Sequence, residues 1–297
     1  KIKIRFINYK RRLNRIIAEE KPDIIHVHSL IYRLDGVNFP ANKIVYTFHA
    51  DVERALRIYS KRNFNVLKKM SSHGLSFFAL TEKAKDDIKK HFNTDRIFIT
   101  PNSVDIDSIK SNAFCREKFL SKLNIPDSAF VVGHIGRFHK VKNHERIIDI
   151  FNAVHKKRRD SFLVLIGGDE DGRMSVIRER IDNCGLGDYV RFLGVRDDAT
   201  AIISCLDVFI LPSFSESFPL VTIEAQALGI KCVVSETVPN EVICNSNCIR
   251  LSLNESNESW AESILIDSQN VCDGDIYKFD KKNVISQLIG LYEKIAG

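Results

Sequence analysis

Two short polar loops in the second half of the chain carry the residues best suited to chemistry. The first, at 213–218, directly follows an apolar run at 208–211. Pro219, the next residue, suits the first turn of a helix, whose free N–H groups would face the loop and attract an anion such as phosphate. Glu216 lies in the loop and Glu224 about one and a half turns into the helix, where carboxylates accept hydrogen bonds from sugar hydroxyls. A solvated loop beside an ordinary helix is the alternative interpretation.

The second loop follows an apolar run at 130–135 and contains Gly136, Arg137 and Lys142. Arginine offers paired N–H groups and lysine a compact charge, so the two cations could hold a diphosphate. A solvated basic loop is the alternative. No G-x-G-x-x-G follows an expected strand and no G-x-x-x-x-G-K-[ST] is present, so the usual motifs for nicotinamide and P-loop nucleotide binding are missing.

Three histidines stand out in the first half of the chain. His26 and His28 alternate along one apolar run, and His49 ends another. A lone histidine is more often packed or capped than catalytic, and we expect this of His26. His28 and His49 are stronger candidates because each lies at the carboxyl end of an expected strand, where ligands bind in open α/β sheets.

Apolar runs alternate with amphipathic helical stretches almost from end to end, which is typical of a parallel α/β fold. The expected strands lie at 23–28, 43–48, 74–80, 96–100, 130–135, 162–166, 190–193, 208–211, 231–234 and 249–251. The expected helices lie at 11–19, 55–69, 82–91, 144–157, 174–183, 219–227 and 281–295. Both polar loops follow expected strands directly.

The pattern loosens between residues 104 and 128, and Pro126 begins a turn just before a new strand. We therefore expect a first domain at 1–125 and a second, doubly wound domain at 126–280. The helix at 281–297 is a candidate to complete the first domain.

The composition is that of an ordinary globular protein, with 44% hydrophobic and 28% charged residues. It excludes a collagen-like or mostly disordered chain. No apolar run approaches the roughly 20 residues of a membrane-spanning helix, so we expect a cytoplasmic protein. The seven cysteines are an odd number spread along the chain, which favours free thiols, and the close pair Cys244 and Cys248 alone gives little support for a zinc site.

Positive charge is concentrated in the first part of the chain. Residues 1–90 hold 20 Lys and Arg against 9 Asp and Glu, net +11, and the remainder holds 24 against 29, net −5, which together give the overall +6. A solvated face is one interpretation. The others are attraction to a polyanionic substrate or peripheral association with anionic lipid at the inner face of the cell membrane. Nucleic acid is not expected, because no groove-reading or aromatic-rich basic motif is present.

Taken together, Gly136-Arg137 with Lys142, and Glu216 with Glu224 at E-x7-E spacing, resemble the donor-binding domain of the family 4 retaining glycosyltransferases. Further stretches that resemble this family, in matching order, are DIIHVH at 23–28, YTFH at 46–49, DVFILPS at 207–213 and EAQALG at 224–229. The variants GRFH at 136–139 with KN at 142–143, and LGVRDD at 193–198, look most like the branch that builds capsular and exopolysaccharides. The resemblance implies the GT-B architecture, in which two Rossmann-like parallel-sheet domains face a cleft.

Carried over position by position, the resemblance implies a site for a nucleotide sugar. Arg137 and Lys142 would clamp the diphosphate, Glu224 would hold the ribose, and Glu216 would contact the donor sugar. His49 would approach the sugar or the acceptor from the first domain. The implied catalytic residues are Glu216, His49, Arg137 and Lys142, and the implied donor-binding residues are Gly136, Arg137, Lys142, Gly194, Val195, Glu216, Ser217, Phe218, Pro219, Leu220 and Glu224. No metal and no cofactor beyond the nucleotide sugar is implied.

The first domain departs from the family pattern. Family members usually begin with a strand, a Gly-rich loop and a further α/β segment, and this chain opens instead with the expected helix at 11–19. We therefore expect the first domain to be incomplete, lacking about 70 residues of the family pattern. The function that the resemblance implies is transfer of a sugar, with retention, to a glycan or lipid-linked acceptor in surface polysaccharide synthesis. A non-catalytic nucleotide- or glycan-binding fragment and a sugar-nucleotide epimerase are the alternatives.

Overall fold

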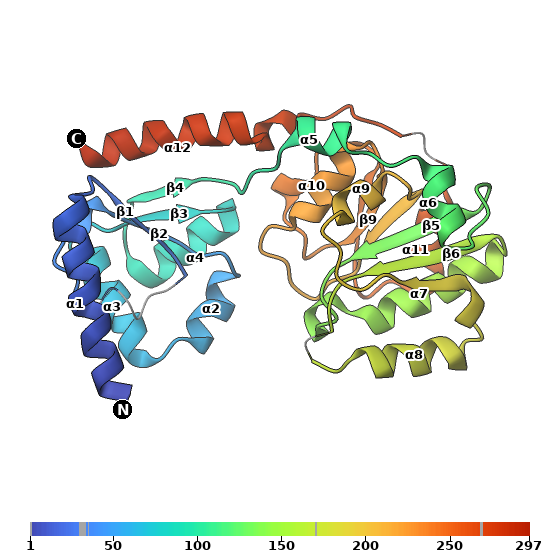
Figure 1. The fold of residues 1–297 in the computed structure, drawn as a ribbon, viewed down its shortest axis with the longest axis horizontal. Coiled ribbons are helices and arrows are strands. Elements are labelled where there is room, and N and C mark those ends of the chain that lie inside the picture. Colours follow the sequence, from blue (N-terminus) through green and yellow to red (C-terminus); the bar gives the residue numbers. More distant parts are fainter. Residues whose placement is uncertain (1, 30–33, 35, 170, 268–269) are drawn as a thin grey trace. The chain divides into compact units, whose positions relative to one another are not determined.

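The computed structural model describes residues 2–29, 34, 36–169, 171–267 and 270–297, with side chains from residue 9 onward. The chain forms two compact α/β units (Figure 1). The first comprises Lys1–Asn102 together with Lys282–Gly297, and the second comprises Ser103–Lys281. Each unit is built on its own parallel sheet, as the sequence predicts.

The first unit is built on a four-stranded sheet in the order β1-β2-β3-β4. Its strands are β1 (Ile25–His28), β2 (Ile44–Thr47), β3 (Ser76–Ala79) and β4 (Ile97–Ile99), and its helices are α1 (Ile2–Glu20), α2 (Val52–Ile58), α3 (Lys61–Ser72), α4 (Glu82–Phe92) and α12 (Lys281–Ala296). Tyr46 and Phe77 anchor the core on one face of the sheet. Phe78 packs on the other face against Tyr292 of α12, with ring centroids 5.8 Å apart. The C-terminal helix therefore supplies part of the core of this unit.

The second unit is built on a six-stranded sheet in the order β10-β9-β8-β5-β6-β7. Its strands are β5 (Phe130–Ile135), β6 (Ser161–Ile166), β7 (Val190–Phe192), β8 (Val208–Leu211), β9 (Lys231–Ser235) and β10 (Cys248–Leu251). Its helices are α5 (Ile106–Ser111), α6 (Arg116–Lys122), α7 (His144–Lys157), α8 (Met174–Asn183), α9 (Ala199–Ile203), α10 (Leu220–Ala227) and α11 (Asn257–Leu265). Helices α7, α8 and α11 cover one face of the sheet through a large apolar core that includes Trp260.

The strand order of the second sheet reverses between β5 and β8. From β5 the chain builds outward through β6 to β7, then returns to place β8 on the other side of β5 and builds outward again through β9 to β10. In open α/β sheets, ligands bind beyond the carboxyl ends of the strands at such a switch point. The two polar loops singled out in the sequence follow the two strands that flank this point.

All ten expected strands are confirmed, because buried parallel strands are near-continuous apolar runs that are easy to identify. The single helix expected at 55–69 is wrong. Tyr59 is extended, and the side chain of Ser60 accepts a hydrogen bond from the backbone N–H of Asn63 at 3.2 Å, so a second helix begins after Ser60. The loose segment expected at 104–128 instead contains α5 and α6, which are too short to show a clear helical period.

The second unit begins at Ser103, earlier than the boundary that the sequence suggested at 125. The contacts of Arg116, on α6, explain why the segment before β5 belongs to the second unit. Its guanidinium donates hydrogen bonds to the carbonyl oxygens of Cys205 and Ala129 at 2.6 and 2.8 Å and forms an ion pair with Asp207 at 2.9 Å. These contacts attach the segment before β5 to the second sheet.

Candidate functional site

Glycines bring three neighbouring strand-end loops into close contact in the second unit. The backbone N–H of Gly136, after β5, donates to the carbonyl of Ile166, and that of Gly167, after β6, donates to the carbonyl of Gly194, both at 2.8 Å. A Cβ on Gly167 would lie 2.0 Å from the carbonyl oxygen of Gly136. Only glycine permits this approach. Gly136 and the loop that carries Gly194 and Val195 therefore lie at the same edge of the sheet.

An ion pair joins the two polar loops at the switch point. Lys142 ends the short helical turn η3 (Lys140–Lys142) after β5, and Glu216 lies in the loop after β8. The Lys142 Nζ and Glu216 Oε1 atoms are 2.7 Å apart, and the two side chains are only 23% and 9% exposed. The backbone N–H of Phe214 also donates to the carbonyl of Val141 at 2.8 Å, which fixes one loop against the other.

Two helices begin beside this ion pair without a side-chain cap. Asn143, the residue before α7, is left-handed and donates its side-chain amide to the carbonyl of Pro212 at 3.0 Å instead of capping the helix. Pro219 precedes α10 and provides no side-chain acceptor. Neither N-cap residue therefore gives a side-chain hydrogen bond to the first N–H groups of its helix. The positive ends of two helix dipoles at the carboxyl edge of the sheet favour an anion.

Glu224, on α10, meets Thr200 of α9. Its carboxylate accepts a hydrogen bond from the side chain of Thr200. Burial raises the pKa of Glu224, and the bond from Thr200 opposes that shift. Thr200 was not predicted, because only the packing of α9 on α10 shows that the two side chains meet.

The remaining predicted residues surround these groups. Arg137 is exposed on the loop after β5, and Val195 is exposed on the loop after β7. Phe218 is buried, with its ring edge-on to Phe279 at 5.4 Å. Ser217 and Leu220, the first residue of α10, are half-buried. Of the four side chains central to the prediction, Lys142 and Glu216 are in direct contact. Arg137 lies on the loop after β5, and Glu224 lies on α10.

The histidines of the first unit form a cluster at the carboxyl end of β1 and β2. His28 Nδ1 and His49 Nε2 are 2.7 Å apart, and their rings stack at 5.0 Å. His26 is bonded through Nδ1 to the hydroxyl of Tyr292 at 2.5 Å and through Nε2 to that of Thr47 at 2.7 Å. The expectation that His26 is a packed residue is confirmed.

Burial lowers the pKa of two members of this cluster. The pKa of His26 falls to about 4, chiefly through burial and then through the neighbouring rings of His28 and His49. Burial and His28 also lower the pKa of His49. The cluster therefore resists acquiring positive charge.

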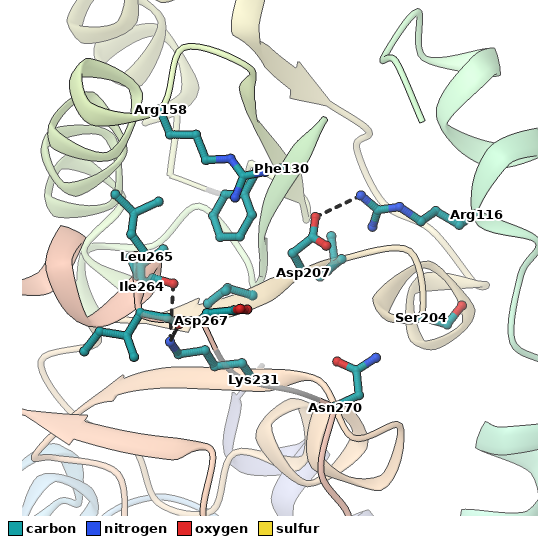
Figure 2. Close-up of a pocket in the computed structure, with 13 residues that line it drawn as sticks. Arg116, Phe130, Arg158, Ser204, Asp207, Lys231, Ile264, Leu265, Asp267 and Asn270 are labelled. Carbon is teal, nitrogen blue, oxygen red and sulfur yellow. Dashed lines mark hydrogen bonds and ion pairs between the residues drawn. The ribbon is translucent and has the colours of Figure 1, made fainter. Parts of the chain in front are cut away.

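A separate cavity of about 360 Å³ lies at the opposite edge of the second sheet, where β5, β8 and β9 begin (Figure 2). Its cationic groups already have partners. Arg116 pairs with Asp207, Arg158 lies over the ring of Phe130 at 4.5 Å, and the buried Lys231 donates to the carbonyl of Ile266 at 2.6 Å. We therefore place the candidate site at the carboxyl edge and not in this cavity.

Two models of known families match the chain. A family model described as "Glycosyl transferases group 1" matches residues 116–266, just over half of the chain. A second, "Glycosyltransferase Family 4", matches residues 2–108. The chain belongs to the group 1 glycosyl transferases.

Two curated relatives illustrate the similarity. One is EpsF of Bacillus subtilis (strain 168), which is named as a glycosyltransferase. It is 29% identical over 177 residues, covering 59% of this chain and 46% of the relative. The UDP-Gal:alpha-D-GlcNAc-diphosphoundecaprenol alpha-1,3-galactosyltransferase of Escherichia coli is 25% identical over 254 residues, covering 80% and 62%. The chain thus spans about half to three fifths of the length of these relatives.

Solved structures show that the fold is GT-B, as predicted. Anabaena Alr3699/HepE in complex with UDP and glucose is 18% identical, with a TM-score of 0.80 over 96% of this chain and 81% of that one. A glycosyltransferase from Rickettsia africae ESF-5 is 17% identical, also with a TM-score of 0.80, over 98% and 81%.

We predict that the first unit loses stability as the pH falls from 6.5 to about 4. The folded-state pKa of His26 lies below its ordinary value of 6.5, so the unfolded chain binds the proton first and stability declines across this window. In His26→Gln the decline should be shallower. Hydrogen exchange of the β2 and β3 amides at a series of pH values measures the decline. Tryptophan fluorescence would not, because the single tryptophan, Trp260, lies in the second unit. An equally steep decline in the variant would contradict the assignment.

Proposed function

We propose that the chain is a retaining glycosyltransferase that takes a sugar from a nucleoside diphosphate donor bound at the switch point of the second sheet. The observation that carries the proposal is the approach of Lys142 to Glu216 at 2.7 Å, beside the N-termini of α7 and α10, whose N-cap residues give no side-chain cap. One cation, two helix dipoles and a carboxylate at one place suit a ligand that joins a diphosphate to a hydroxyl-rich sugar.

The cationic side of the site acts on the leaving group. As the bond between sugar and phosphate breaks, negative charge develops on the diphosphate. We propose that Lys142, Arg137 and the first N–H groups of α10 stabilise that charge. We propose that these fixed positive groups supply the charge stabilisation for which other enzymes use a metal ion.

The carboxylates act on hydroxyl groups. Glu216 orients the donor sugar, and the acceptor hydroxyl attacks from the face that the leaving group vacates, so Glu216 need not become a covalent nucleophile. Glu224 holds the ribose, while Gly194 and Val195 lie beside the base. We propose that His49 acts on the sugar or the acceptor. The similarity of the chain to the family supports each of these roles.

The relatives suggest the class of donor and acceptor. The Anabaena protein was solved with UDP, and the Escherichia coli relative is named for a UDP-galactose donor and a diphosphoundecaprenol-linked acceptor. We therefore propose a UDP sugar as donor and a glycan or lipid-linked acceptor, in the synthesis of a surface polysaccharide.

Substitution of two donor-site residues should weaken nucleotide binding. We expect Arg137→Ala and Glu224→Ala each to lower the affinity for UDP at least about tenfold, because each removes a charged hydrogen bond to the ligand. Isothermal titration calorimetry measures the effect. Lys157→Ala is the control, since Lys157 lies at the far end of α7 in an exposed pair with Glu262 at 2.6 Å. Unchanged affinity in both donor-site variants would remove the assignment.

The Lys142–Glu216 pair predicts opposite effects on binding and transfer. In Glu216→Gln the carboxylate no longer competes for Lys142 or repels a diphosphate, so UDP should bind several-fold more tightly. Transfer from an α-linked UDP sugar should nevertheless become much slower, because the sugar loses its orienting group. Lys142→Ala should weaken UDP binding.

Calorimetry and a transfer assay with NMR analysis of the product test these expectations. The wild-type product should keep the α configuration of the donor. Weaker UDP binding by Glu216→Gln would contradict the proposed arrangement, and a β-linked product would contradict retention.

We also propose that the basic first unit binds anionic membrane surfaces peripherally. Arg11, Arg12 and Arg15 are exposed on α1, beside the half-exposed Ile16. No helix among the described residues is long and apolar enough to cross a bilayer. Cations near an anionic surface each contribute about 1 kcal/mol of binding free energy, so the three arginines together should raise the affinity for anionic vesicles about a hundredfold at low salt.

Co-sedimentation with phosphatidylcholine vesicles, with and without phosphatidylglycerol, measures this association. We expect salt-sensitive binding to the anionic vesicles only, and its loss when Arg11, Arg12 and Arg15 are all replaced by Ala. The matched control replaces three exposed cations of the second unit, Lys156, Lys157 and Arg159. Binding that is absent, or equally reduced in the control, would count against the proposal.

A further inference from the structure

His134, near the end of β5, lies at the base of the turn that carries Arg137 and Lys142. The pairing between β5 and β8 ends at Gly133 and Phe209. One residue further along, the imidazole of His134 connects the strands, with Nδ1 2.9 Å from the carbonyl oxygen of Ile210. The side chain is completely buried. His134 thus forms part of the floor of the switch point.

The contacts of His134 determine its tautomer. A carbonyl oxygen can only accept, so Nδ1 carries the proton. Burial, followed by the charges of His144 and Lys142, lowers the pKa of His134 well below its ordinary value, so the ring is neutral and Nε2 bears a lone pair. This atom is buried and has no hydrogen-bond partner in the described part of the chain. It faces Gly136, where a Cβ would lie 2.9 Å from Nε2 and 3.4 Å from the Cδ and Cε atoms of Lys142.

A second buried imidazole supports the same turn. His144, the first residue of α7, stacks on Phe138 at 4.3 Å and lies edge-on to His134 at 4.8 Å. Its ring also forms a hydrogen bond with the backbone of Gly136. Burial is the main cause that lowers the pKa of His144 to about 4. Both rings are therefore neutral near pH 7, and each contacts the 136–142 turn at Gly136.

We propose that His134 and His144 are positioning residues, two neutral imidazoles that hold the 136–142 turn, and with it Lys142, in the geometry that binds a diphosphate. Gly136 has no side chain with which to fill the space beneath the turn, and the two rings fill it instead. A charged ring at either position would repel Lys142. The inference rests on the proposed function for the identity of the ligand, whereas the support of the turn can be measured without any ligand.

A matched pair of variants separates the hydrogen bond from the shape of the side chain. Asparagine and leucine are similar in size, but only His134→Asn retains an N–H donor close to the position of Nδ1. In the absence of nucleotide, we expect the amides of 136–142 to exchange faster in His134→Leu and at nearly the wild-type rate in His134→Asn, with the amides of α8 unaffected. We also expect His134→Leu to weaken UDP binding at least about tenfold and His134→Asn to restore most of the affinity.

Each outcome decides the inference. Wild-type exchange rates in His134→Leu, or identical behaviour of the two variants, would overturn it. Faster exchange in His134→Leu alone would support it even if the wild type bound no nucleoside diphosphate, a result that would overturn only the proposed function. Should His134→Leu fail to fold, the ¹⁵N imidazole spectrum of the wild type decides. We expect both rings as the neutral Nδ1–H tautomer at pH 7, and a charged or Nε2–H ring at either position would overturn the proposal.

Discussion

The contact between Lys142 and Glu216 depends on the reversal of strand order in the second sheet, and the rest of the candidate site is arranged around it. The two residues are 74 positions apart in the chain, yet their charged atoms lie 2.7 Å apart. The sheet achieves this by placing β8 beside β5 after β6 and β7 have been added on the other side. Two helices then begin at the same edge, so positive charge is concentrated where the carboxylate lies.

Close backbone packing gives this edge its rigidity. A side chain at Gly167 would collide with the carbonyl of Gly136, so the loops after β5 and β6 approach more closely than other residues allow. His134 and His144 support the same loop from below. A flexible lysine on a mobile loop would lose conformational entropy on binding an anion, whereas a loop fixed from several sides loses less. The arrangement therefore favours the proposed binding of a phosphate group.

The two units carry different chemistry. The second holds the ion pair and the helix N-termini, whereas the first holds the histidine cluster and carries the net positive charge. Tyr292 of the C-terminal helix bonds to His26, so the last segment of the chain contributes to the environment of residues near its beginning. A change at Tyr292 can therefore alter the histidine cluster.

The sequence by itself determined the ten strands, the parallel α/β class, and the position of both polar loops at strand ends. Continuous apolar runs, Pro219 and the glycines act through neighbours along the chain, so they can be recognised locally. Only the tertiary structure decided that Glu224 meets Thr200, that His134 bonds to Ile210, and that the segment before β5 belongs to the second unit. These contacts depend on strand order and helix packing, which join residues far apart in the chain and leave no periodic pattern in the sequence.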